Sequence, residues 1–315
     1  MSIKRKLFFL TLLSIFVVLS SFYIYKQFIE EKPKVVVVLR ILDLQYWEII
    51  KAGAEKGFKD LGIDGKVVAT KNGTIEEQMD ILKDVLKEKP DVLVVSPINS
   101  EVNPILDEFV KRNIPILIMN ADDAWEKKTA YIGTNNLELG KKAGILLASQ
   151  LQPGDQVALL GRQTTIEEER IKGAKISLDT VGIKVVTEKL DLPIIDNSAV
   201  EEAMKTILQE HPDLKGVIAS SDYVAIPALK VTQEHGLEIP VTGTDGLTEM
   251  LTLIKEGTLT STVTQNPYDM GYLSIEAALK VTKGEKVRPI IDSGVDIITK
   301  GNADQRLKFL KNVLD

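Results

Sequence analysis

The chain has 315 residues, 44% of them hydrophobic and 27% charged, which is the balance of a folded globular protein long enough for two domains. The net charge of −6 leaves no excess of basic residues for nucleic acid, so we expect no nucleic-acid partner. With no cysteine and two histidines, disulfides, thiolate metal sites and a lipid-modified cysteine are excluded, and we expect no metal, no cofactor and no catalytic residue.

The beginning of the chain differs from the rest. Lys4, Arg5 and Lys6 precede Leu7–Ile24, an uncharged stretch that reaches the lower limit for a membrane-spanning helix. Positive charges before such a stretch keep the N-terminus in the cytoplasm and place the following chain outside. We therefore predict a signal-anchor helix and linker over residues 1–33, with an extracytoplasmic body anchored to the cell membrane. An uncleaved anchor is favoured over a cleaved export signal because no clear small-x-small cleavage site follows, but both interpretations stay open.

Strand and helix patterns then alternate. A strand is predicted over Val35–Leu39, where four consecutive valines suit burial on both faces. A turn containing Arg40 leads into a helix over Tyr46–Leu61, because apolar residues recur there every three or four positions. The other predicted elements of this series are strands at Lys66–Thr70, Val92–Ser96, Ile116–Met119 and Ala130–Gly133, and helices at Thr74–Glu88 and Val102–Arg112.

A second series of similar length follows. Its predicted helices are Asn136–Leu151, Ile166–Thr180, Ser198–Glu210, Val224–Glu234 and Thr248–Glu256, and its predicted strands are Gln156–Leu160, Lys184–Leu190, Gly216–Ala219 and Pro240–Thr244. Alternation of this kind indicates parallel sheets with right-handed crossovers. The expected fold is therefore α/β, with two doubly wound parallel-sheet lobes.

The remaining chain is too short for a third lobe. It contains predicted strands at Leu259–Thr264 and Val295–Thr299 and predicted helices at Tyr268–Lys283 and Ala303–Val313. Since these pieces cannot form a core of their own, we expect them to cross back and complete both lobes through a multi-strand hinge. The predicted N-terminal lobe comprises residues 34–135 and 266–294, and the predicted C-terminal lobe comprises residues 136–265 and 295–315.

Several short motifs follow one another through these elements. They include Tyr46-Trp47 with Ala52-Gly53-Ala54, Thr134-Asn135-Asn136, Arg170-x-x-Gly173, His211-Pro212-Asp213, Ser221-Asp222, Gly243-Thr244-Asp245-Gly246 and Thr264-Gln265-Asn266-Pro267. In this order they resemble the type I periplasmic sugar-binding proteins, most closely the ribose-binding group, whose fold also forms the effector domain of lactose-repressor-like regulators. The resemblance covers nearly all of Val35 to Thr299 and implies two lobes that close on a small polar ligand by hinge bending.

The resemblance also implies which residues contact the ligand. Carried over position by position, they are Tyr46, Trp47, Asn120, Arg170, Ser221, Asp245 and Gln265. A sugar ring offers an apolar face to an aromatic ring and a rim of hydroxyls that donate and accept hydrogen bonds. Asp245 only accepts, Arg170 only donates and Gln265 does both, so these side chains suit that rim.

The same residues have ordinary structural interpretations. Tyr46 and Trp47 at a helix start are often core residues. Arg170 follows three glutamates and suits a solvated helix face, and Asp245 before a glycine suits a turn.

The turn after the first strand departs from the resembling family. Arg40 stands where that family usually has a small hydroxyl residue, and Leu44 where it has an asparagine. Two interpretations stay open: Arg40 favours an acidic or phosphorylated sugar, or it pairs with Asp43 or Asp122 and does not touch the ligand.

We therefore expect an extracytoplasmic solute-binding protein that clamps a small carbohydrate or sugar-like ligand and delivers it to an ABC importer permease. The alternative is a membrane-tethered sugar receptor that signals to a sensor histidine kinase, because a protein anchor is unusual for a transport receptor. An enzyme is not expected, since the sequence has no Gly-x-Ser-x-Gly elbow and no Gly-x-Gly-x-x-Gly opening a helix.

Overall fold

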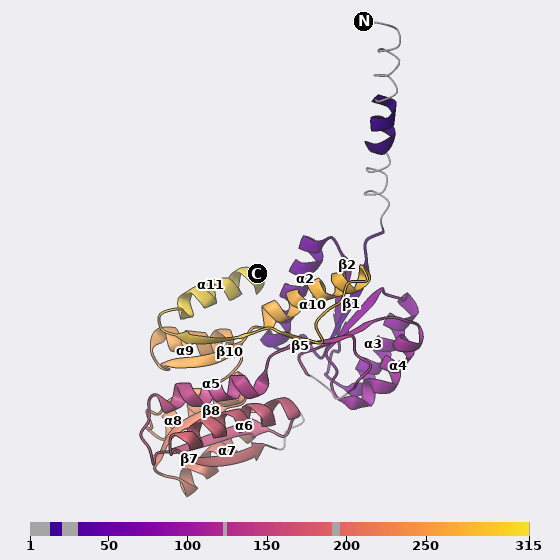
Figure 1. The fold of residues 1–315 in the computed structure, drawn as a ribbon. Helices are drawn as coiled ribbons and strands as arrows, with labels where there is room; N and C mark the ends of the chain where they lie inside the picture. The colour runs from indigo at the N-terminus through magenta and orange to yellow at the C-terminus, as the bar shows by residue number, and fades with distance from the viewer. Residues whose placement is uncertain (1–12, 21–30, 122–124, 191–195, 315) are drawn as a thin grey trace, which may run out of the picture. The chain divides into compact units, whose positions relative to one another are not determined.

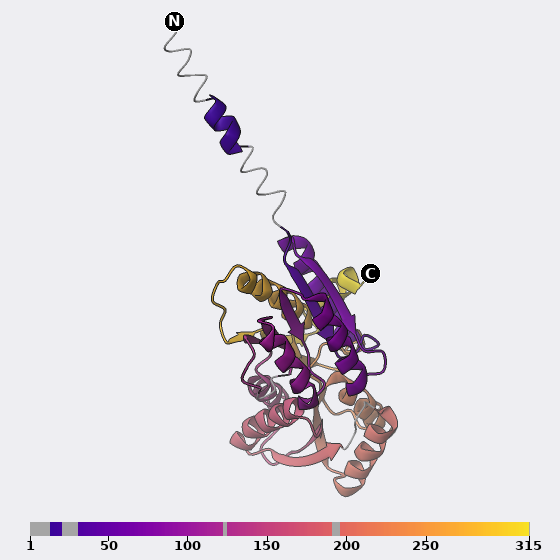
Figure 2. The same cartoon turned by 90° about the vertical axis from the view of Figure 1, so that its right-hand side faces the viewer.

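The computed structural model describes residues 13–20, 31–121, 125–190 and 196–314 (Figure 1 and Figure 2). It divides the chain into two compact units, Met1–Pro33 and Lys34–Asp315, and the second unit is called the body below. Residues 13–20 are helical. A search of the described residues finds no helix with the length and apolar character to cross a membrane. Most of the predicted span Leu7–Ile24 lies outside the described residues.

The first sheet of the body has six parallel strands in the order β11-β5-β4-β3-β1-β2. The strands are β1 (Lys34–Leu39), β2 (Asp64–Ala69), β3 (Val92–Val95), β4 (Ile116–Met119), β5 (Ala130–Gly133) and β11 (Ile290–Asp292), and the helices around them are α2 (Gln45–Leu61), α3 (Ile75–Glu88), η1 (Ser100–Val102), α4 (Asn103–Lys111) and α10 (Pro267–Thr282). Val35 and Val37 pack in a core cluster with α2 and α10, whereas Val36 and Val38 pack with α3 and α4. The sheet is thus buried on both faces, as the valine run predicts.

The second sheet has four parallel strands in the order β7-β6-β8-β9. The strands are β6 (Gln156–Arg162), β7 (Lys184–Leu190), β8 (Leu214–Ala219) and β9 (Val241–Thr242), and the helices are α5 (Asn136–Ala148), α6 (Thr165–Thr180), α7 (Asn197–Glu210), α8 (Asp222–Glu234) and α9 (Thr248–Glu256). Val157 and Leu159 pack against α5 and α6, and Ala158 and Leu160 pack against α7 and α8. The two sheets are therefore built in the same way.

An antiparallel pair, β10 (Ser261–Gln265) with β12 (Val295–Thr299), and the last helix, α11 (Ala303–Leu314), complete the body. The two parallel sheets confirm the predicted fold class. One strand, β11, is absent from the predicted elements, because three residues at a sheet edge carry no periodic pattern. The exact residues at which the lobes divide stay a prediction.

The chain passes between the two sheets after β5, after β10 and after β11. Side chains at these crossings contact one another. Thr134 Oγ1 lies 3.4 Å from Gln265 Oε1 and 3.1 Å from Ser293 Oγ. Gln265 therefore lies at a crossing, where its side chain is within reach of residues from both sheets.

Helices α5 and α6 approach closely at two glycines. A Cβ added to Gly140 would lie 1.9 Å from the carbonyl oxygen of Arg170, and one added to Gly173 would lie 2.1 Å from that of Leu137. Only glycine permits this approach, which holds the backbone of Arg170 against α5. The Arg170 side chain then reaches Asn136 on α5, donating from Nε to Oδ1 at 2.9 Å.

Replacing Gly140 with alanine tests this packing. Alanine is the better helix former by about 1 kcal/mol, yet its methyl would meet a backbone carbonyl that cannot move alone. We expect the Gly140→Ala variant to lose about 2 kcal/mol of unfolding free energy in urea denaturation. The matched control is Gly301→Ala, where the nearest atom lies at 3.6 Å and the change should stay within about 0.5 kcal/mol. Wild-type stability of Gly140→Ala would contradict the close approach.

Candidate functional site

The structure places the predicted site residues at the carboxyl ends of strands or on adjoining helices. Tyr46 and Trp47 open α2, Asn120 follows β4, Arg170 lies in α6, Ser221 follows β8, Asp245 follows β9, and Gln265 ends β10. In open parallel sheets ligands bind beyond the carboxyl ends of the strands. The observed positions are therefore those expected of a ligand site.

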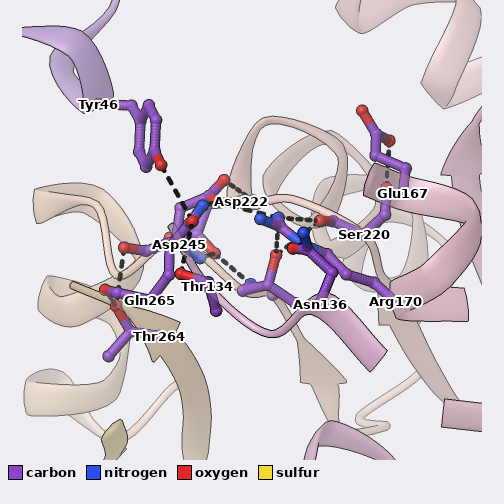
Figure 3. A network of polar contacts seen from close by, with 12 residues as sticks. Tyr46, Thr134, Asn136, Glu167, Arg170, Ser220, Asp222, Asp245, Thr264 and Gln265 are labelled. Carbon is purple, nitrogen blue, oxygen red and sulfur yellow. Dashed lines mark hydrogen bonds and ion pairs between the residues drawn. The ribbon is translucent and has the colours of Figure 1, made fainter. Parts of the chain in front are cut away.

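Gln265 joins the two halves of this site (Figure 3). Its side-chain Nε2 donates to Asp245 Oδ1 at 2.7 Å, and its Oε1 lies 3.0 Å from the Tyr46 hydroxyl. The same hydroxyl lies 2.8 Å from Asn120 Oδ1, so its single proton has two acceptors. All four side chains are buried. Burial, followed by the negative charge of Asp245, raises the pKa of Tyr46 well above its ordinary value, and Tyr46 therefore remains a hydrogen-bond donor.

Arg170 contributes the positive charge of the network and is 5% exposed. Its Nη1 donates to the Ser220 carbonyl oxygen at 2.8 Å and to Thr244 Oγ1 at 2.9 Å. The same nitrogen lies 3.4 Å from Asp245 Oδ1 in a buried ion pair. This geometry contradicts the alternative that Arg170 is a solvated surface charge. Among the described residues, its Nη2 has no hydrogen-bond partner.

Asp222 holds the loop that carries Asp245 (Figure 3). Its Oδ1 accepts from the backbone N–H groups of Thr244 at 2.9 Å and Asp245 at 3.1 Å, and its Oδ2 accepts from that of Leu247 at 2.7 Å. In return, the Asp222 backbone N–H donates to Asp245 Oδ2 at 3.0 Å. Burial and the charge of Asp245 raise the pKa of Asp222 to about 7, against the lowering effect of the three N–H donors. Asp222 is thus a positioning residue.

The two aromatic residues occupy different surroundings. Tyr46 belongs to the hydrogen-bond network, whereas Trp47 is 6% exposed and packs in the core cluster with α10. The two rings meet edge to face, with centroids 5.2 Å apart. The guanidinium carbon of Arg40 lies 5.9 Å from the Trp47 ring centroid. A stacking role of Trp47 against a sugar stays a prediction.

Ser221 lies beside the network without joining it. It is 6% exposed, and its Oγ is buried without a hydrogen-bond partner among the described residues. Ser221 also stands at the N-cap of α8 without capping it through its side chain. Its hydroxyl is therefore available to a ligand, although the prediction that it contacts one remains untested.

Arg40 forms no ion pair with Asp43 or with any other described carboxylate, so that part of the pairing interpretation is not observed. Asp122, the other predicted partner, lies outside the described residues.

Among the residues that the structure does describe, no group of three or more histidine, aspartate or glutamate side chains is arranged to hold a metal ion. The absence of a metal or cofactor stays a prediction.

Sequence reasoning missed several residues that support the site. They are Thr134, Asn136, Glu167, Ser220, Asp222 and Ser293. Asn136 and Asp222 stand inside the motifs Thr134-Asn135-Asn136 and Ser221-Asp222. The motifs therefore contain both residues but do not indicate what their side chains bind. Their partners lie far away in the sequence and cannot be identified from spacing.

Comparisons with known proteins are consistent with this geometry. A family model described as "Periplasmic binding protein domain" matches residues 35–286. The ribose import binding protein of Bacillus subtilis is 26% identical over 261 residues, which cover 82% of this chain and 85% of that protein. The structure of a glucose-galactose binding protein from Geobacillus stearothermophilus is similar, with a TM-score of 0.78, 27% identity and coverage of 87% of this chain and 99% of that one. A carbohydrate transporter solute binding protein from Agrobacterium radiobacter, in complex with D-arabinose, also has a TM-score of 0.78 and 27% identity, covering 89% and 99% of the two chains.

Removing the buried guanidinium tests the network. The Arg170→Ala variant leaves Asp245 without its cation, and breaking a buried pair of this kind costs about 3 kcal/mol of unfolding free energy. The matched control on the same helix is Lys175→Ala, whose ion pair with Asp179 is exposed and should contribute less than about 0.5 kcal/mol. Urea denaturation of both variants measures the difference. Equal losses would mean that Arg170 is not the buried partner described.

Proposed function

The chain belongs to the family of periplasmic binding proteins, and we propose that it is an extracytoplasmic solute-binding protein that binds a small carbohydrate or sugar-like ligand and delivers it to an ABC importer. The observation that carries this proposal is the buried set formed by Arg170 of α6 with Asp245 and Gln265 at strand ends. Arg170 is a charged donor, Asp245 is a charged acceptor, and the Gln265 amide both donates and accepts. Together they can bind adjacent hydroxyl groups of a ligand through hydrogen bonds of defined direction. Relatives with this fold bind ribose, glucose, galactose or D-arabinose according to their names.

The proposed motion is closure of two lobes divided as the sequence predicts, over residues 34–135 with 266–294 and residues 136–265 with 295–315. Contacts at the start of α2 support it. The Gln45 side chain donates to Thr248 Oγ1 at 2.8 Å and accepts from the Thr248 backbone N–H at 2.9 Å, which caps the first turn of α9. The Tyr46 backbone N–H lies 3.4 Å from the Tyr223 hydroxyl. Opening the lobes would exchange these two exposed or partly buried contacts of Gln45 and Tyr46 for water at little cost.

Tyr46, Trp47, Asn120, Arg170, Ser221, Asp245 and Gln265 are the proposed ligand contacts. We assign them no catalytic role, and propose that the protein is a binding protein and not an enzyme. The family and its similar members are binding proteins by name. Asp222 is enclosed by backbone N–H donors and Tyr46 remains protonated, so neither supplies a free base.

A sensor histidine kinase is the alternative partner. The uncharged stretch Leu7–Ile24 behind Lys4, Arg5 and Lys6 favours it, because an uncleaved anchor would hold the body beside a membrane receptor. Deleting the gene separates the two roles. For an import receptor, we expect uptake of the radiolabelled ligand to fall by about tenfold or more, as delivery to the permease is lost. Unchanged uptake together with lost ligand-dependent transcription would favour the kinase partner instead.

Thermal shift measurements with a panel of pentoses, hexoses and inositol test the carbohydrate proposal. A ligand present at about 100 times its Kd should raise the melting temperature by roughly 5 °C or more, because it binds only the folded state. The Asp245→Asn variant should lose most of this shift, since it removes the charged acceptor. The control Asp304→Asn removes an exposed carboxylate on α11 and should keep the shift. If no sugar or polyol shifts the wild-type transition, the carbohydrate proposal fails.

A further inference from the structure

The first strand of each sheet ends at an arginine. Arg40 directly follows β1, and Arg162 is the last residue of β6. Both side chains are only partly buried, and that of Arg162 is 22% exposed. Burial, followed by the positive charge of Arg162, lowers the pKa of Arg40 to about 10. Each arginine stands two residues beyond a paired strand residue, Val38 in β1 and Leu160 in β6, so the two occupy corresponding positions in the two sheets.

Two of the three arginines near the strand ends have their own carboxylates. Arg162 donates from Nε to Glu167 Oε1 at 2.6 Å, and Arg170 is paired with Asp245. Arg40 differs from both. No described carboxylate lies within ion-pair distance of it, and its Nε is buried without a hydrogen-bond partner among the described residues. The described site thus holds one positive charge that no neighbouring carboxylate offsets.

Each arginine has a serine on the neighbouring strand end. Ser96 follows β3, which pairs with β1, and Ser221 follows β8, which pairs with β6. Both serines are nine-tenths or more buried, and the Oγ atom of each has no hydrogen-bond partner among the described residues. Leaving a buried hydroxyl or guanidinium nitrogen unpaired is costly, so these atoms indicate a ligand that accepts hydrogen bonds. The two sheets differ here, because Ser220, which corresponds to Ser96 in the second sheet, donates its hydroxyl to Glu167, and the unpaired hydroxyl belongs to the next residue, Ser221.

We propose that the ligand is a sugar acid, whose carboxylate binds Arg40 while its hydroxyls meet the network around Asp245. The inference rests on the proposed function and specifies its ligand class. A carboxylate carries one negative charge and only accepts hydrogen bonds, which matches the single uncompensated guanidinium and the unpaired donors. A phosphate dianion carries two negative charges against one uncompensated guanidinium, and it fits the charges less well.

Isothermal titration with matched ligand pairs tests the inference. The pairs are D-glucose with D-glucuronate, D-galactose with D-galacturonate, and D-ribose with ribose 5-phosphate. We expect one sugar acid to bind about tenfold or more tightly than its neutral parent, which is the scale of a hydrogen bond to a charged group. The Arg40→Gln variant should remove most of this preference and change the affinity for the neutral parent less than about threefold.

Two controls accompany the titrations. Arg288→Gln removes one exposed positive charge that precedes the amino end of β11, at the opposite edge of the parallel strands, and should keep the preference, which separates local from long-range electrostatics. The melting temperature of Arg40→Gln without ligand should equal or exceed that of the wild type, because an unpaired and partly dehydrated charge is removed.

The outcomes separate the two proposals. Equal or tighter binding of a neutral sugar would overturn the sugar-acid inference and leave the carbohydrate proposal supported, as would be found if Asp122 neutralised Arg40. Preference for the phosphorylated sugar over every carboxylate would also overturn the inference. Absence of binding by all six compounds would overturn both.

Discussion

The orientation of one side-chain amide, that of Gln265, constrains the rest of the site. Asp245 can only accept hydrogen bonds, so the Gln265 NH2 group must face it, and the Gln265 oxygen must then face Tyr46. Tyr46 in turn keeps its proton and donates. The negative charge on Asp245 therefore determines which atoms donate and which accept in the series of hydrogen bonds that runs from Arg170 to Tyr46. Because Gln265 lies at a crossing between the two sheets, this arrangement of hydrogen-bond donors and acceptors extends from one sheet to the other.

Such a network is organised before a ligand arrives. Arg170 is held by helix packing at Gly140, and the loop around Asp245 is held by three backbone N–H groups that donate to Asp222. A ligand that binds here pays little to order these side chains, and this favours affinity and geometric selectivity. Among the described residues, Arg40 Nε, Ser96 Oγ and Ser221 Oγ are buried without hydrogen-bond partners, and the proposed ligand would supply them.

Much of the fold can be predicted from the sequence because it follows from local patterns. Four valines predict a strand buried on both faces, and Thr74 predicts a helix start where its side chain accepts from the N–H of Glu77. The short edge strand β11 carries no such pattern. In the site, the motifs predict Arg170, Asp245 and Gln265 but not the roles of Asn136, Ser220 and Asp222, which hold Arg170 and Asp245 in place. The role of Asp222 depends on backbone N–H groups more than twenty residues away, which spacing along the sequence does not reveal.

A crystal structure of the protein grown with the sugar or sugar acid that most raises its melting temperature tests the central claim most directly. That claim is that the ligand binds between the two sheets on the side chains ordered by Gln265. The expected result is ligand density within hydrogen-bond distance of both Asp245 and Arg170. Ligand density elsewhere on the body, with the Asp245–Gln265 and Asp245–Arg170 contacts unchanged and no ligand beside them, would contradict it.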